Sequence, residues 1–217
     1  RLSFADFIKF GSVAIPLVIF CILGVLILIK LLIKKVPISS KMSYLIAIGT
    51  SVCGATAIVA TAPVINAKKT EVAYAIANIT LFGVIAMLVY PYFAEWYFDN
   101  NGLNAGLFLG TSIHETSQVA AAGLIYDQQF NNPETLDVAT VTKLIRNTFL
   151  VILIPLFAFL YNRGEFKDQK YSILSIFPYF VLGFIGMIIV RNLGDQFITF
   201  ESENFYVWSK FIEYLKI

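Results

Sequence analysis

Residues 49–65 read GTSVCGATAIVATAPVI, and residues 110–126 read GTSIHETSQVAAAGLIY. The two stretches match at Gly-Thr-Ser, continue with a β-branched residue and stay rich in Ala, Thr and Ser. Each lies inside a long apolar segment, where Gly, Ser and Thr either let helices pack closely or let the backbone open to bind a ligand. A match this short also arises by chance in Ala-rich sequence, but the adjacent His114 and Glu115 in the second stretch favour a binding role.

The composition places the chain in a membrane. Hydrophobic residues make up 58% of the 217 and charged residues 14%, and the mean hydropathy is +0.76. Soluble domains carry about a quarter charged residues. Apolar runs of about 20 residues, the length that crosses a bilayer as a helix, recur along the chain. The predicted spans are 12–33, 44–65, 72–92, 103–126, 138–161 and 172–190.

The fold class that follows is an all-α, polytopic transmembrane bundle with discontinuous helices. The chain starts at Arg1 without a Met and closes on the aromatic-rich stretch 197–217. We therefore expect residues 1–217 to form a single transmembrane domain that is a fragment of a longer protein. Cys21 and Cys53 fall in different spans and are expected to pack as small residues rather than to form a disulfide.

Basic residues indicate the orientation of the spans. They crowd the first and fifth loops, at Lys34, Lys35, Lys41, Arg163, Lys167 and Lys170. If all six segments cross, these loops share a side, and the positive-inside rule makes it cytoplasmic. Glu95 and Asp99 would then lie on that side too, with Lys68 and Lys69 opposite. With a single predicted span between them, the two Gly-Thr-Ser segments are expected to run parallel.

His114 and Glu115 are the only adjacent ionisable pair well inside an apolar span. On one continuous helix, Thr111, Glu115 and Gln118 share a stripe with His114 beside it. Each charge at membrane depth costs about 2.5–3.5 kcal/mol, so such groups face a bundle interior or water. Desolvation favours the uncharged forms of both groups, which suits proton coupling near neutral pH. The alternative is a structural hydrogen bond between helices.

Lys143 and Arg146 lie one helical turn apart at the entry to the fifth predicted span. Arg offers a planar fork of donors and Lys a mobile point charge, so the pair is a candidate anion site. The alternative is that both side chains snorkel to lipid headgroups. The remaining candidate substrate ligands are the small polar residues of the repeated stretches, namely Thr50, Ser51, Gly54, Thr111, Ser112 and Gln118. Close helix packing explains the same residues equally well.

Nucleotide and metal chemistry find no support in the sequence. There is no Gly-rich loop followed by Lys-Ser or Lys-Thr, so ATP hydrolysis is not expected. One His in the chain, with Gln118 where a zinc protease needs its second His, excludes the usual zinc motif. No cofactor, metal or nucleic-acid partner is expected.

Taken with the segments AYAIANITLFGVIAMLVYP (73–91) and VTKLIRNTFLVILIP (141–155), the two repeated stretches resemble the bacterial YeiH-type membrane proteins. Members of that family are labelled as candidate sulfate exporters. The resemblance runs from about Leu2 to Asn192. It implies further spans outside this chain and a kinship with inverted-repeat antiporters and bile-acid symporters. The chain departs from the family at Asn66, where a Lys is common.

The sequence thus predicts a multi-pass protein of the bacterial inner membrane that exports or exchanges a small anion, such as sulfate or a sulfonate. Lys143 and Arg146 would attract the anion, and His114 and Glu115 would carry a coupling proton. One alternative is a sodium-coupled organic-anion symporter in which Glu115 and Gln118 bind sodium. A second is an intramembrane enzyme that uses His114 and Glu115 as acid and base, although no nucleophile or metal set accompanies them, so an enzyme is not expected.

Overall fold

The computed structural model describes residues 4–32, 38–154 and 156 of the chain, and within them every regular element is a helix. The helices are α1 (Phe4–Leu32), α2 (Ser40–Ser51), α3 (Ala55–Thr61), α4 (Lys69–Phe98), α5 (Gly102–Ser112), α6 (Thr116–Phe130) and α7 (Thr135–Thr148). After Phe149 the chain is helical again over residues 150–154. All belong to one compact unit, Arg1–Phe177, and the second unit, Pro178–Ile217, lies outside the described residues.

Two of the described helices are long and apolar enough to cross a bilayer. The apolar stretch Gly11–Leu28 of α1 covers most of the predicted span 12–33, and α4 contains the predicted span 72–92. The helix α7 begins just before the predicted span 138–161. The predicted span 172–190 and the basic residues of the fifth loop lie outside the described residues.

The predicted span 44–65 is two helices, α2 and α3, that form a hairpin. Lys41, at the start of α2, donates its Nζ to the carbonyl of Asn66, just after α3, at 2.8 Å. Before α2, Ser39 Oγ donates to Glu71 Oε1 near the start of α4 at 2.5 Å, while Gly49 near the end of α2 packs against Ile79 in the middle of α4. The hairpin therefore has its open end at the start of α4 and its tip at the middle of α4.

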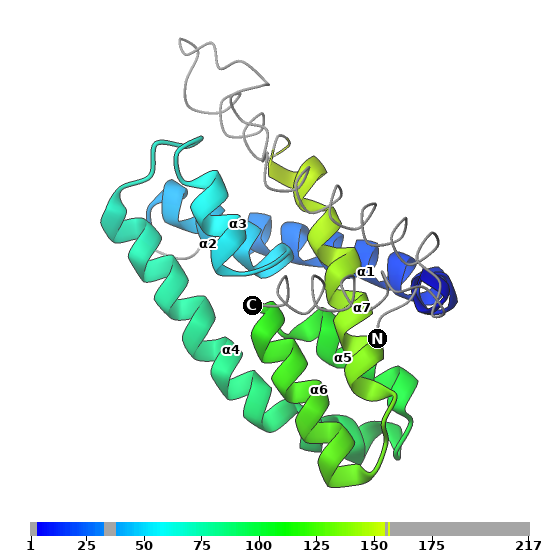
Figure 1. The fold of residues 1–217 in the computed structure, drawn as a ribbon. Coiled ribbons are helices and arrows are strands. Elements are labelled where there is room, and N and C mark those ends of the chain that lie inside the picture. The colour runs from blue at the N-terminus through cyan, green and yellow to red at the C-terminus, as the bar shows by residue number, and fades with distance from the viewer. Residues whose placement is uncertain (1–3, 33–37, 155, 157–217) are drawn as a thin grey trace, which may run out of the picture. The chain divides into compact units, whose positions relative to one another are not determined.

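The predicted span 103–126 is a second hairpin, α5 and α6. Gly102, where α5 begins, packs against Asn132, which follows α6. Along α6, Gln118 Nε2 donates to Thr80 O of α4 at 3.3 Å and Tyr126 OH donates to Glu95 Oε2 at 2.7 Å. The open end of this hairpin is therefore at the end of α4, and its tip again reaches the middle. Figure 1 shows α2 and α3 beside one half of α4 and α5 and α6 beside the other.

The two Gly-Thr-Ser segments consequently run antiparallel, and the expectation of parallel segments was wrong. The chain does not cross at either segment but turns back at each break, and α4 carries it from the first hairpin to the second. The helix α7 then returns along α6, from the contact of Leu136 with Asp127 to that of Asn147 with Thr116. The order is hairpin, long helix, hairpin, helix.

Because both hairpins turn back, the charged residues are distributed differently from the sequence prediction. Lys41, Lys68 and Lys69 gather at the start of α2 and α4, whereas Glu95 and Asp99 lie at the other end of α4. The second hairpin and α7 add only acidic residues to that other end, at Asp127, Glu134 and Asp137. The expected placement of Lys68 and Lys69 opposite Lys41, and of Glu95 and Asp99 beside it, was therefore wrong. Basic residues thus predominate at the start of α4, where Glu71 also lies, and acidic residues at its other end.

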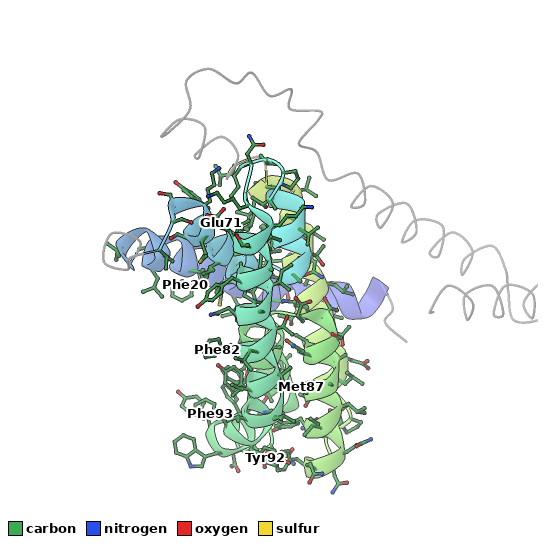
Figure 2. All side chains as sticks on the ribbon, turned by 90° about the vertical axis from the view of Figure 1, so that its left-hand side faces the viewer. Phe20, Glu71, Phe82, Met87, Tyr92 and Phe93 are labelled. Carbon is green, nitrogen blue, oxygen red and sulfur yellow. The ribbon has the colours of Figure 1, made fainter. Side chains whose placement is uncertain are left out.

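Close glycine contacts hold α5 against α7. Gly106 and Gly110 lie one turn apart on α5, and a Cβ added at either would come within 3 Å of α7 atoms, Val138 Cβ at 2.6 Å and Ala139 O at 2.6 Å. The outer side of α4 is apolar and exposed: Phe82 is 59% exposed, and in Figure 2 it projects outward with Phe93. An exposed apolar surface of this kind suits contact with lipid.

Candidate functional site

The first break separates α2 from α3 at residues 52–54. Val52 has φ −128° and ψ −89°, and Gly54 has φ +66° and ψ −123°. The backbone of Gly54 lies where L side chains are strained, so the turn requires glycine here. The Gly54 N–H donates to Gly49 O at 3.0 Å, and the helix restarts at Ala55.

The second break separates α5 from α6 at residues 113–115. Ile113 and Glu115 are extended, with ψ 141° and 137°. Both breaks therefore follow Gly-Thr-Ser directly, which confirms that the repeated stretches lose regular helical hydrogen bonding. Because the helix ends at Ser112 and restarts at Thr116, the predicted stripe through Thr111, Glu115 and Gln118 was wrong.

Lys143 joins the two breaks. Its side chain is fully buried, and its Nζ donates to Val52 O at 2.8 Å and to Ile113 O at 3.0 Å. The two carbonyls belong to different hairpins, so the tips approach within the reach of one ammonium group. The ends of the two Gly-Thr-Ser segments therefore meet inside the bundle.

Arg146 makes the same connection one turn further along α7. It is 2% exposed, and its guanidinium donates to Ser51 O at 2.9 Å, to Thr111 O at 2.7 Å and to Thr50 O. The last carbonyls of a helix have no partner within it. Lys143 and Arg146 thus satisfy the carbonyl ends of both α2 and α5, an arrangement that headgroup snorkelling does not describe.

Glu115 binds the other half-helix of the first hairpin. Its Oε1 accepts a hydrogen bond from Ala55 N at 2.6 Å, at the beginning of α3. A Cβ added at Gly54 would lie 2.3 Å from the same oxygen, so the glycine also makes room for the carboxylate. This contact is a hydrogen bond between helices of the kind the structural alternative requires, and it leaves the carboxylate at the meeting point of the tips.

The hydroxyl groups of the repeated stretches are partly used within their own helices. Ser51 Oγ donates to Ala47 O at 2.7 Å, and Thr111 Oγ1 donates to Leu107 O at 2.7 Å. The contacts of Thr50, Ser51 and Thr111 with Arg146 go through their carbonyls. Ser112 ends α5 beside the break and is half-buried.

His114 lies within the second break, and Gln118 lies in the first turn of α6. Gln118 is 7% exposed and donates to Thr80 O, while its Oε1 has no hydrogen-bond partner among the described residues. The Nδ1 atom of His114 is buried and also lacks one there. No cluster of three or more His, Cys, Asp and Glu side chains occurs in the described part of the chain.

The ionisable groups at the tips are not equal in number. Each helix end acts as about half an elementary charge, so the carbonyl ends of α2 and α5 and the N–H ends of α3 and α6 cancel. Of the ionisable side chains there, two are basic, Lys143 and Arg146, and one is acidic, Glu115, so the formal count has one basic group in excess.

Several residues of the site carried no signal in the sequence. Val52, Ala55 and Ile113 act through backbone atoms, which any residue supplies. Asn147, whose Nδ2 donates to Thr116 Oγ1 at 3.3 Å, had a weak signal as a polar residue following Arg146. Gly83 admits the Gln118 carboxamide against α4, since a Cβ there would lie 2.0 Å from Gln118 Oε1.

The sequence model of a family described as "Conserved hypothetical protein 698" matches residues 1–205. The chain is 38% identical to a UPF0324 membrane protein of Fusobacterium nucleatum over 91% of this chain and 57% of the relative. It is 35% identical to a UPF0324 membrane protein of Streptococcus agalactiae (92% and 60%) and 30% identical to one of Clostridium tetani (89% and 58%).

This is the same family as the YeiH-type proteins, so the resemblance drawn from the sequence is confirmed. The chain spans less than two thirds of the length of these relatives. No solved structure matches.

Proposed function

The chain belongs to the family described as conserved hypothetical protein 698, whose curated relatives are named membrane proteins, and from this premise we propose that it is part of a secondary transporter for a small anion. The observation that carries the proposal is the buried pair Lys143 and Arg146 between the tips of two interrupted helices. Discontinuous helices are the usual binding element of secondary transporters.

The order of the helices supports an inverted repeat. The unit α2–α4 is a hairpin followed by a long helix, and α5–α7 is a hairpin followed by a helix of the opposite direction. Both units carry Gly-Thr-Ser at the same place before their break. Two such units can rock against each other around a fixed site, which is the motion that alternating access needs.

The proposed substrate is an oxyanion such as sulfate or a sulfonate, exported or exchanged across a bacterial inner membrane. The excess of one basic group at the tips favours an anion over a cation. Glu115, which contacts Ala55 of the opposite hairpin, is the proposed carrier of a coupling proton, with His114 as its modulator.

Two alternatives remain distinct from this proposal. In a sodium-coupled symporter, the side-chain oxygens of Glu115 and Gln118 would bind sodium, and the partnerless Gln118 Oε1 suits that role. In an intramembrane enzyme, His114 and Glu115 would act as acid and base, and both lie at the break before α6.

The test is counterflow of labelled sulfate, methanesulfonate and acetate in proteoliposomes that contain the complete protein. We expect exchange of at least one of these anions, stimulation by a pH gradient and no response to sodium. Exchange driven by sodium would favour the symporter. No movement of any of the three, relative to empty liposomes, would overturn the proposal.

A further inference from the structure

A groove lies between the turn after α3 and the start of α4. Its volume is about 480 Å³, and it is lined by residues 62, 63, 66 and 67 on one side and residues 69, 72, 73 and 76 on the other. Apart from Asn66 and Lys69, these residues are alanine, proline, valine or isoleucine. The two polar residues lie at the end of α4 where Figure 2 labels Glu71. The groove is therefore apolar along its length, with polar groups at one end.

The length of α4 sets the depth of this groove in a bilayer. The helix has 30 residues, so it is about 45 Å long, against about 30 Å for the hydrocarbon core. Centred in the bilayer, it extends about 7 Å into the headgroups on each side. Trp96 and Tyr97 are exposed near its far end, where an aromatic belt is expected. Lys69 then lies at the level of the lipid phosphates, and Ile76, about 10 Å further along, lies in the hydrocarbon.

The ammonium group of Lys69 is available to a headgroup. Its side chain is exposed and has no hydrogen bond or ion pair with another described residue. The acidic residue of the same turn, Glu71, is already engaged: it accepts from Ser39 Oγ at 2.5 Å and from the backbone N–H of Lys68 at 2.9 Å. Lys41, Lys68 and Lys69 against Glu71 leave this end of the groove basic.

We propose that this groove binds an anionic phospholipid, with an acyl chain along its apolar walls and the headgroup phosphate on Lys69. A basic group at headgroup depth attracts the phosphate, and the apolar channel below it removes the chain from competing contacts. A zwitterionic lipid would bring a second, positive charge to an end that is already basic. The hairpin tips reach the middle of α4, whereas the groove lies at its start, so this lipid site is separate from the proposed transport site.

The test measures which phospholipid contacts the groove. Tyr74→Trp places a tryptophan at an exposed position next to Ala73, in the complete protein with every other tryptophan replaced by phenylalanine. The protein is reconstituted in phosphatidylcholine vesicles that contain brominated phosphatidylglycerol or brominated phosphatidylcholine with the same chains. Bromine quenches the tryptophan when the lipid is bound beside it. A protein that keeps Trp96 as its single tryptophan is the control at the other end of α4.

We expect phosphatidylglycerol to bind beside the Tyr74→Trp reporter about fivefold more strongly than phosphatidylcholine, the effect of one basic side chain at a membrane surface. At Trp96, near the acidic Glu95 and Asp99, we expect no preference for phosphatidylglycerol. Equal binding of the two lipids at Tyr74→Trp would overturn the site. An equal preference at both reporters would also overturn it, because that result describes anionic lipid around the whole protein.

Lys69→Ala and Lys68→Ala remove the same charge from neighbouring exposed positions, but Lys69 lines the groove and Lys68 does not. Lys69→Ala should abolish the preference for phosphatidylglycerol, and Lys68→Ala should keep most of it. Equal losses in the two variants would show a general attraction to the basic surface and would overturn the assignment to the groove.

Two further measurements test the apolar walls. Ala73→Phe fills the groove and should reduce the preference, whereas Ala77→Phe, exposed one turn further along α4, should not. Glycerol phosphate, which has the headgroup charge without the chains, should fail to displace brominated phosphatidylglycerol, and full displacement would overturn a lipid site in favour of a soluble anion.

A second readout needs no reporter and replaces quenching if Tyr74→Trp does not fold. Phosphatidylglycerol added to the complete protein in detergent should raise the melting temperature more than phosphatidylcholine does, and Lys69→Ala should lose this difference while Lys68→Ala keeps it. An unchanged difference in Lys69→Ala would overturn the proposal. Neither readout depends on whether the protein transports an anion.

Discussion

At the scale of single residues, Lys143 and Arg146 first of all donate hydrogen bonds to backbone carbonyls. A hydrogen bond from a charged donor contributes about 1.5–3 kcal/mol, and these two side chains make five contacts with carbonyls of two hairpins. The sequence left the pair as either a candidate anion site or side chains that snorkel to headgroups, and it could not indicate which atoms the pair contacts. Every residue has a backbone carbonyl, so the sequence does not show which carbonyls a side chain contacts.

Truncation of either cation should weaken anion uptake more than it lowers expression. In Lys143→Ala and Arg146→Ala, we expect uptake per molecule to fall by at least about tenfold, since losing one buried charge contact costs more than about 1.4 kcal/mol. Sulfate counterflow, normalised to reconstituted protein, measures this. Lys69→Ala, at the exposed basic end, is the control, and unchanged transport in both variants would exclude a role for the pair in transport.

Glu115→Gln should remove the pH dependence of transport and leave part of the exchange. Gln keeps an oxygen that can accept from Ala55 N, so the contact between the hairpins survives while the exchangeable proton is lost. Loss of His114 should shift the pH profile without abolishing it. The measurement is counterflow across a series of pH values, with Glu71→Gln at the exposed start of α4 as the control. Uphill transport by Glu115→Gln under a pH gradient would remove the proton role.

At the scale of elements, the breaks were predictable and the hairpins were not. Gly-Thr-Ser inside an apolar segment marks a weak point in a helix, and both helices end there. Whether the chain continues across the bundle or turns back depends on backbone torsions. The composition of an apolar segment is the same in both cases, so it does not distinguish them. The torsions of Gly54 are the clearest example. This turn needs a glycine, but a glycine in the sequence does not by itself show that the chain turns.

Gly54→Ala should destabilise the protein by about 1–3 kcal/mol, the cost of a side chain in such a conformation. The added Cβ would also meet Glu115 Oε1 at 2.3 Å. Gly24→Ala is the matched control, because a Cβ there meets nothing within 4 Å and alanine favours the helix by up to about 1 kcal/mol. Thermal unfolding in detergent compares the two, and equal stability of both variants would contradict the assigned geometry at the break.

At the scale of the whole molecule, the sequence supplied the class and the family but misplaced the loops. Composition alone indicated a helical membrane protein, because bilayer spans leave a strong signal. The side of each loop was predicted on the assumption that every apolar segment crosses the membrane. Two segments turn back instead, so the predicted sides of Lys68, Lys69, Glu95 and Asp99 were reversed. The corrected arrangement has a cleaner separation of charge than the one expected.

The basic end should face the cytoplasm. In a variant without Cys21 and Cys53, a new cysteine at Lys41 or Lys69 should react with a membrane-impermeant maleimide only from the inner side, and one at Asn100 only from the outer side. Right-side-out and inside-out vesicles provide the comparison. Labelling of Lys41→Cys and Lys69→Cys from different sides would contradict the first hairpin, and a reversal of all three would contradict the orientation.

The position of α7 has a mechanical consequence. Lys143 holds one carbonyl from each tip, and Arg146, on the same rigid helix, holds both tips as well. Neither tip can withdraw from the other unless these side chains give up hydrogen bonds in a buried setting. The helix α7 therefore links the two tips, so that in the proposed transporter a tilt of α7 would move both tips at once and would couple opening on one side of the site to movement on the other.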